Sequence, residues 1–188
     1  MHTAFTICSN NYLAQAKTLG DSLLKHNPDH RFVIFLVDTL SKDVDYDLFK
    51  AFEIIPVAQL FPGDFDKLWQ KYDIVELNTC VKPSCFKYLF QRDPSIGHLY
   101  YFDPDIMLFS SLAELEKEFI DNNILLTPHL TSPIDIDDKF PLENHFLNYG
   151  IYNLGFLGLK RNDEVMGLLH WWEKRTLLMG FIQPQHGI

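Results

Sequence analysis

Two carboxylates in the segment from Tyr100 to Met107 have the type and spacing that a divalent metal site needs. Asp103 and Asp105 are one residue apart, and in an extended chain such side chains point to the same face. There they can hold a hard cation such as Mn²⁺ or Mg²⁺. The spacing alone is not specific, because Asp-x-Asp pairs occur at 43/45, 45/47, 64/66, 103/105 and 135/137. At least four of the five pairs must therefore be solvated or capping acids.

The sequence context singles out the pair at Asp103 and Asp105. The apolar, aromatic run over 97–102 predicts a buried strand, and the acids follow its carboxyl end, where open α/β sheets bind ligands. Pro104 fixes φ and cannot donate to a ladder, so the chain is expected to leave the sheet here. Buried surroundings would make unpaired carboxylates costly, so a metal, a basic partner or a proton is required. The simpler interpretation is two turn acids after a strand.

Strand-like and helix-like segments alternate along the chain. We predict strands over 4–8, 31–37, 53–57, 97–102, 124–127 and 151–159, and helices over 12–26, 45–52, 64–72, 78–91, 111–122 and 162–172. This alternation predicts an α/β fold with a mainly parallel central sheet flanked by helices. A chain of 188 residues is long enough to form it as a single domain.

Several helix boundaries carry recognisable signals. Residues 9–11 and Asn162 have the types that cap helices, Ser111 with Glu114 forms a capping-box pattern, and Asn27 with Pro28 ends the first helix. Residues 128–148 lose periodicity and read as a loop, a length that suits a lid over a site.

Composition excludes some classes of partner. The net charge is −9 and there is no basic run, so nucleic acid is not expected to bind. No apolar run approaches the roughly 20 residues that span a bilayer, and the N-terminus lacks the regions of a signal peptide. A cytoplasmic protein follows, for which peripheral membrane association stays open. Cys8, Cys80 and Cys85 are too few for a disulfide framework and are expected to be buried thiols.

The residues around Asp103 and Asp105 resemble the metal-binding segment of GT-A-type nucleotide-sugar glycosyltransferases, notably bacterial enzymes similar to the retaining galactosyltransferase and glycogenin group. Other segments agree in order along the chain. Residues 5–12 resemble the strand and loop that hold the base and ribose of UDP, with Tyr12 where uracil stacks. Asp38 resembles a nucleoside contact, and Lys82 a basic residue that reaches the donor. Residues 126–129 and 152–156 match later sugar-site segments.

The resemblance implies a GT-A (Rossmann-like) fold that transfers a hexosyl unit from a UDP-sugar to the hydroxyl of a saccharide or another acceptor. Residues 1–109 would form the nucleotide-binding part, and residues 110–188 the sugar and acceptor side. A Mn²⁺ or Mg²⁺ ion would be held by Asp103 and Asp105. The implied nucleotide contacts are Thr6, Ile7, Cys8, Ser9, Tyr12, Asp38, Lys82, Asp103, Pro104 and Asp105. The implied sugar contacts are His129, Asn153, Leu154 and Gly155, and Asn153 joins the two acids as a catalytic residue.

Each implied contact also has a simpler structural explanation. Tyr12 could pack into the core, Lys82 could be exposed with Lys87 serving instead, and His129 could be a buried, hydrogen-bonded loop residue. Asn153 could pair with the backbone. Residues 9–11 are first of all a helix cap, and Trp171 with Trp172 is more typical of packing than of a sugar platform.

The resemblance has a gap near the end of the sequence. A later Asp-Gln segment and a metal-binding His of the galactosyltransferase group are absent, and His186 does not match that His motif. The chain is therefore either a fragment or uses another segment for these groups. A catalytically incomplete nucleotide-sugar-binding protein is one alternative. A sugar nucleotidyltransferase is another, although residues 9–12 lack the glycines and arginine of its phosphate loop. No residue stands out as a nucleophile or general base.

Overall fold

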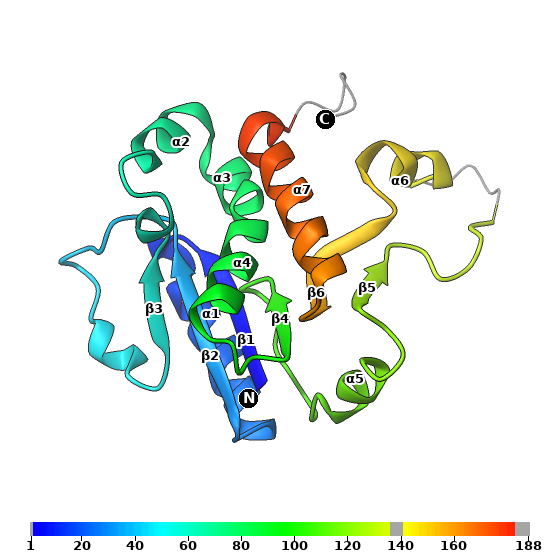
Figure 1. Ribbon diagram of the computed structural model, residues 1–188, viewed down its shortest axis with the longest axis horizontal. Coiled ribbons are helices and arrows are strands. Elements are labelled where there is room, and N and C mark those ends of the chain that lie inside the picture. Colours follow the sequence, from blue (N-terminus) through cyan, green and yellow to red (C-terminus); the bar gives the residue numbers. More distant parts are fainter. Residues whose placement is uncertain (1, 136–140, 183–188) are drawn as a thin grey trace.

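The computed structural model describes residues 2–135 and 141–182, without the side chains of 147–149. Within them, a six-stranded sheet has the order β3-β2-β1-β4-β6-β5 (Figure 1). The strands are β1 His2–Cys8, β2 His30–Leu36, β3 Glu53–Pro56, β4 His98–Phe102, β5 Ile124–Pro128 and β6 Tyr152–Lys160. The helices are α1 Leu13–His26, α2 Phe65–Lys71, α3 Ile74–Cys80, α4 Lys82–Arg92, α5 Ala113–Glu118, α6 Glu143–Tyr149 and α7 Asp163–Met179. Short 3₁₀ helices are η1 Asn10–Tyr12, η2 Tyr46–Phe49 and η3 Val57–Leu60.

The sheet is mainly parallel, as predicted. β1 pairs in parallel with β2 and β4, and β2 pairs in parallel with β3. β6 is the reversed strand, antiparallel to both β4 and β5. This reversal matters for the site, because it sets the start of β6 beside the end of β4.

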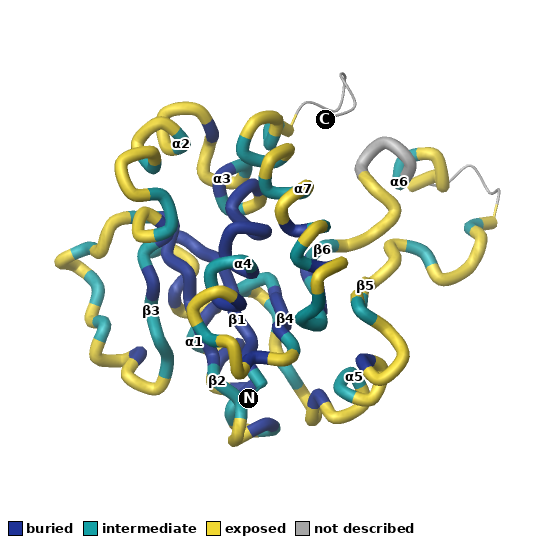
Figure 2. Tube along the Cα trace, viewed as in Figure 1, coloured by how far each residue is buried: buried dark blue, intermediate teal, exposed yellow. Residues whose placement is uncertain are grey.

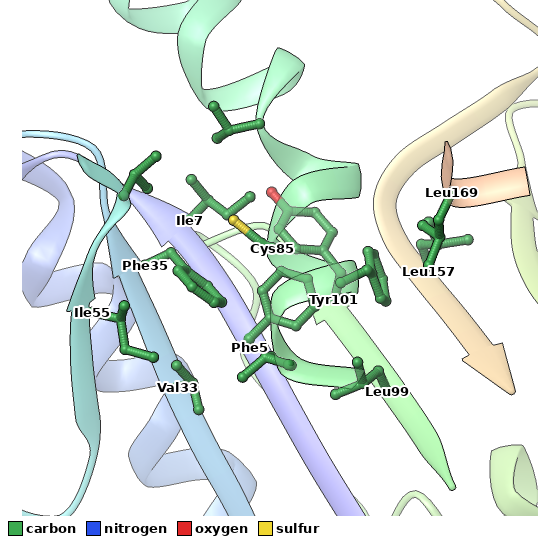
Figure 3. Close-up of a cluster of buried hydrophobic side chains, with 14 of the residues drawn as sticks. Phe5, Ile7, Val33, Phe35, Ile55, Cys85, Leu99, Tyr101, Leu157 and Leu169 are labelled. Atoms are coloured by element: carbon green, nitrogen blue, oxygen red, sulfur yellow. The ribbon is translucent and has the colours of Figure 1, made fainter. Parts of the chain in front are cut away.

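Helices cover both faces of the sheet, and strand alternation divides the buried side chains between two cores, of which Figure 3 shows the one around Phe5 and Tyr101. On β1, Phe5 and Ile7 face α4 and α7, while Ala4 and Cys8 face α1 on the other side. Figure 2 shows that burial is concentrated in the central strands and α4, whereas the β5 and α6 region is largely exposed. The rigid part of the fold therefore lies under the ends of β1 and β4.

The predicted helix over 78–91 is two helices. α3 is capped by Asp73, which forms a capping box with Glu76, and α4 begins at Lys82 with Pro83 in its first turn. Proline has no N–H and its ring clashes with the carbonyl four residues earlier, so one helix cannot run through this point. Pro83 is tolerated at the start of a new helix. The break places Lys82 at a helix N-terminus.

Other boundaries also differ from expectation. Only a 3₁₀ turn forms within 45–52, and α6 occupies part of the predicted loop over 128–148, of which residues 136–140 lie outside the described part. Ser111 Oγ accepts from the Ala113 N–H instead of forming the box with Glu114, and α5 ends at Glu118. Ser9 makes no side-chain cap. The Asn162 cap is confirmed, but α7 continues to Met179.

Tertiary contacts account for the extra length of α7. Thr176 Oγ1 donates to Cys80 O at 2.8 Å, and the Tyr72 hydroxyl donates to carbonyls of the same last turns of α7. Trp172 packs against the core and Trp171 lies under Arg175 at the surface, so packing explains both tryptophans. Such contacts between distant segments leave no periodic signal in the sequence.

The three cysteines are free and buried, as predicted. Burial raises the pKa of the Cys8 and Cys80 thiols to about 12, so both are protonated at neutral pH. Among residues 2–135 and 141–182, no helix combines the length and apolarity needed to cross a bilayer.

Candidate functional site

A cleft of about 550 Å³ opens at the carboxyl ends of β1 and β4, beside α2, α3 and the start of α4. It is lined by Ile7, Cys8, Ser9, Asn11, Tyr12, Asp38, Trp69, Ile74, Val75, Asn78, Thr79, Lys82, Tyr101, Asp103, Pro104 and Asp105. Nine of these residues are among the ten nucleotide contacts expected from the sequence. The remaining one, Thr6, is fully buried and does not line the cleft.

Asp103 and Asp105 lie in a turn directly after β4. The last strand pair is Phe102 with Phe156, after which the Asp103 N–H donates to Gly155 O at 2.8 Å. The Ile106 N–H then donates back to Asp103 O at 3.1 Å, which closes the turn. The expected departure from the sheet at Pro104 is confirmed, but the acids are not in extended chain. They are also not buried, because the Asp103 side chain is 42% exposed and Asp105 is exposed.

Asp103 is oriented by two neighbours inside the molecule. The Tyr101 hydroxyl donates to Asp103 Oδ1, and Lys82 Nζ lies 3.7 Å from the same oxygen. Burial, with the nearby Asp103 charge, raises the pKa of Tyr101 well above its ordinary value, so this hydroxyl keeps its proton. Both contacts use Oδ1, which leaves Asp103 Oδ2 facing β6.

Lys82 is a buried cation in the wall of the cleft, so the interpretation that it is exposed is wrong. Its ammonium donates to Leu154 O at 3.2 Å and lies 4.2 Å from the centre of the Tyr101 ring. Burial lowers the pKa of Lys82, while the Asp103 carboxylate opposes that shift. Lys87 pairs with Glu173 and does not line the cleft, so the structure does not favour it as the substitute.

The start of β6 lies beside Asp103. Asn153 Oδ1 accepts from the Gly155 N–H at 2.8 Å, so the backbone-pairing explanation for Asn153 holds. A Cβ at Gly155 would lie 2.9 Å from Asn153 Oδ1 and 3.2 Å from Asp103 Oδ2. Glycine at 155 therefore lets these two oxygens approach the strand closely. Asn153 and Gly155 lie next to Asp103, as the sequence order suggested.

The loop after β1 forms the other end of the cleft. Tyr12 is 44% exposed and lines the cleft, which contradicts its packing into the core. Asp38, at the end of β2, accepts from the Asn10 N–H at 2.6 Å and holds this loop in place. Ser9 bonds to Asn11 within the loop. Proximity to Asp38 also contributes to the raised pKa of Cys8.

His129 lies apart from this cleft. Its Nδ1 is 2.9 Å from Gly150 O, and its ring contacts Phe146 in a separate hollow beside α6. It is hydrogen-bonded, as the simpler explanation proposed, but exposed instead of buried. The structure does not bring it to Asp103.

Sequence reasoning missed the wall formed by α2 and α3. Trp69 is an exposed aromatic residue facing the cleft, and Asn78 and Thr79 lie in the turn of helix before Lys82. Asn78 lies four positions before Lys82, and the sequence predicted both residues in one continuous helix, whereas the structure has them in α3 and α4. The signal available in the sequence was Trp69 itself, a large aromatic residue within the predicted helix over 64–72.

The donor atoms at the turn suit a hard divalent cation. Asp103 Oδ2, the Asp105 carboxylate and Asn153 Oδ1 are all oxygens, the ligand type that Mg²⁺ and Mn²⁺ prefer. Within the described ranges, no third His, Cys, Asp or Glu completes a three-residue set with the two acids. The other Asp-x-Asp pairs behave as solvated or capping acids where described: Asp45 caps η2 and Asp64 pairs with Lys67, while the pair at 135/137 extends outside the described residues.

Comparison with known proteins identifies the fold. No family model matches the sequence, and no curated protein matches it. Among solved structures, the galactosyltransferase LgtC with donor and acceptor sugar analogues has a TM-score of 0.56 at 16% identity, over 98% of this chain and 68% of that one. Mouse xyloside xylosyltransferase 1 has a TM-score of 0.52 at 15% identity, over 99% and 73%. The glycosyltransferase GlyE of Streptococcus pneumoniae TIGR4 has a TM-score of 0.52 at 13% identity, over 94% and 38%.

These neighbours are GT-A glycosyltransferases, and their low identities establish the fold alone. The resemblance drawn from the residues around Asp103 is thus confirmed at the level of architecture. The chain has the GT-A fold of the nucleotide-sugar transferases.

Proposed function

We propose that this protein is a glycosyltransferase that moves a hexosyl unit from a UDP-sugar to an acceptor hydroxyl, with a divalent cation held by Asp103 and Asp105. The observation that carries the proposal is that the acid turn after β4 lines one cleft with Tyr12 and Lys82, while Gly155 of β6 bonds to the backbone of Asp103 and Asn153 lies beside it. The GT-A fold supports it.

The charge of the cleft favours a metal-dependent reaction. Three carboxylates and one ammonium group line it, a net charge of −2. That ammonium, on Lys82, already faces Asp103 and a backbone carbonyl. A diphosphate would be repelled from such a surface, so a further positive charge is needed. A cation bound by Asp103 and Asp105 would supply it and would stabilise the charge that develops on the departing diphosphate.

The protein's own side chains would orient the donor. Tyr12 and Trp69 are 44% and 47% exposed and line the same cleft, so either ring can stack on a planar base. Lys82 and Tyr101 hold Asp103 through Oδ1 and leave Oδ2 free for a ligand. Asn153 and Gly155, beside that free oxygen, would shape the sugar pocket.

A thermal-shift panel of UDP, GDP, CDP and ADP, each with and without Mn²⁺, tests the proposal. We expect UDP to raise the melting temperature only with Mn²⁺, and Asp105→Asn to remove that rise. Asp43→Asn is the matched control, because Asp43 is an exposed member of another Asp-x-Asp pair outside the cleft. The proposal fails if no nucleotide shifts melting, or if the shift ignores the metal.

The same protein preparations distinguish the proposed transferase from the two alternatives, a nucleotide-sugar-binding protein and a sugar nucleotidyltransferase. Metal-dependent UDP binding without donor turnover would identify a nucleotide-sugar-binding protein. Release of pyrophosphate from a nucleoside triphosphate and a sugar phosphate would identify a nucleotidyltransferase.

A further inference from the structure

The amino ends of the strands form the edge of the sheet opposite the cleft, and this edge carries a row of histidines. His30, His2 and His98 begin the adjacent strands β2, β1 and β4, and the strand register sets His2 beside both of the others. Glu116 of α5 reaches this edge, where it contacts His2 and His30. Nitrogen and oxygen ligand atoms are thus gathered far from Asp103.

Three of these side chains point their ligand atoms at one another. His2 Nδ1 lies 3.3 Å and His30 Nε2 lies 3.4 Å from the same oxygen, Glu116 Oε1. All three atoms lie within 4.8 Å of one another. Yet both nitrogens are buried and neither makes a hydrogen bond among the described residues. Buried polar atoms in this state call for an explanation, and a bound ion is one of the few available.

The two nitrogen-to-oxygen separations fit tetrahedral coordination. Zn²⁺ binds histidine nitrogen at about 2.0–2.1 Å and carboxylate oxygen at about 2.0–2.2 Å, so neighbouring ligands of a tetrahedron lie about 3.3 Å apart. The two nitrogen-to-oxygen separations have this length.

We propose that His2, His30 and Glu116 form a second metal site, which takes a divalent transition-metal ion of the Zn²⁺ type. Two imidazoles and a carboxylate are a ligand set that Zn²⁺ accepts, whereas Mg²⁺ prefers oxygens alone.

The protonation of His30 agrees with this geometry. Metal ligation needs a neutral imidazole. Burial, followed by the charge of His2, lowers the pKa of His30, so its neutral form is favoured at neutral pH.

The surroundings leave one coordination position and an access route. His98 stacks on Phe119 at 4.4 Å and its ring centre is 6.4 Å from that of His2, so it stands outside the ligand set. The His2 side chain is 41% exposed, which lets an ion reach the site, and water can complete the tetrahedron. Bound metal would tie the starts of β1 and β2 to α5.

Metal-binding measurements on chelator-treated, desalted protein test the site. We expect wild type to take up one Zn²⁺ per chain in competition with a chromophoric chelator, and Co²⁺ to give the visible spectrum of a tetrahedral site. Glu116→Gln should weaken Zn²⁺ binding at least about 100-fold, since even outer-shell partners of metal ligands are worth about 10- to 100-fold. His2→Ala should do the same, and it is the variant safer for folding because the His2 side chain is partly exposed.

Two control variants test whether Zn²⁺ binds at the histidine cluster and not elsewhere. His170→Ala removes an exposed histidine of α7, and Asp105→Asn alters the cleft; both should keep Zn²⁺ affinity within a factor of two or so of wild type. The site is refuted if wild type binds no Zn²⁺, if Glu116→Gln and His2→Ala bind it as tightly as wild type, or if Asp105→Asn abolishes binding. None of these outcomes bears on UDP binding at the cleft.

Discussion

The carboxyl ends and the amino ends of the strands form two opposite edges of the sheet, and these edges carry different side-chain chemistry. At the carboxyl edge, Asp103 and Asp105 offer oxygens in an open cleft that a nucleotide could enter. At the amino edge, His2, His30 and Glu116 offer mostly nitrogens in a compact, partly buried cluster. Hard and borderline cations should therefore separate between the edges. Strand ends set both positions, and the cleft lies at the carboxyl edge.

The largest expected difference between the edges is in catalysis. Asp105→Asn should lower Mn²⁺-dependent release of UDP from UDP-hexoses by at least about 100-fold, the scale seen when a group that stabilises developing charge is removed. Glu116→Gln should leave this rate unchanged, because Glu116 lies at the other edge. Steady-state assays with UDP-glucose and UDP-galactose provide the measurement. Equal losses in the two variants would contradict the division of roles.

A smaller effect is expected from crowding the carboxyl edge. In Gly155→Ala, the new Cβ would lie 3.2 Å from Asp103 Oδ2 and 2.9 Å from Asn153 Oδ1. We expect Mn²⁺-dependent UDP affinity to fall about tenfold, a change of about 1.4 kcal/mol, with little loss of thermal stability because the crowded atoms are side-chain ends. Calorimetric titration gives the affinity. Gly167→Ala is the control, since nothing lies within 4 Å of its Cβ; unchanged affinity in Gly155→Ala would remove Gly155 from the site.

The smallest effect concerns acid sensitivity of the amino edge. Burial, followed by the charge of His2, lowers the pKa of both His30 and His98. The unfolded chain therefore takes up protons near pH 6.5 before the folded chain does, so the free energy of unfolding should fall as pH drops from 7.5 to 5.5. Denaturation with a chelator present measures it. His30→Gln should make the free energy of unfolding depend less on pH. An unchanged pH dependence in this variant would mean that groups other than His30 cause the effect.

The local signals in the sequence were sufficient for most of the fold. Three kinds of signal identified the α/β layers: the apolar run before Asp103, the helix ends near Asn27 and Asn162, and the alternation of strands and helices. Each signal spans only a few neighbouring residues, so it can be recognised in the sequence. The split at Pro83 was readable in principle, since a proline there cannot lie inside a helix. The length of α7 was not, because packing against Cys80 and Tyr72 sustains it.

Within the cleft, the sequence indicated the ends of β1, β2 and β4 and missed α2 and α3. Resemblance placed Tyr12 and Asp38 with Asp103, and the structure brings them together because the strand ends of a parallel sheet meet at one edge. Trp69 and Asn78 come from helices whose orientation depends on packing, which no short pattern encodes. His129 was placed at the site by resemblance alone, and the path of the chain after β5 takes it elsewhere.

What the sequence alone determined was the acid turn at the end of a buried strand, since strand, proline and carboxylates are neighbours in the chain. The tertiary structure decided what surrounds that turn. The antiparallel register of β6 sets Gly155 against Asp103, and the break before α4 sends Lys82 into the wall of the cleft. It also decided the histidine cluster, because parallel pairing aligns the starts of β1 and β2 and packing brings Glu116 of α5 to them. Residues far apart in sequence come together only through such long-range pairing, which local sequence patterns do not specify.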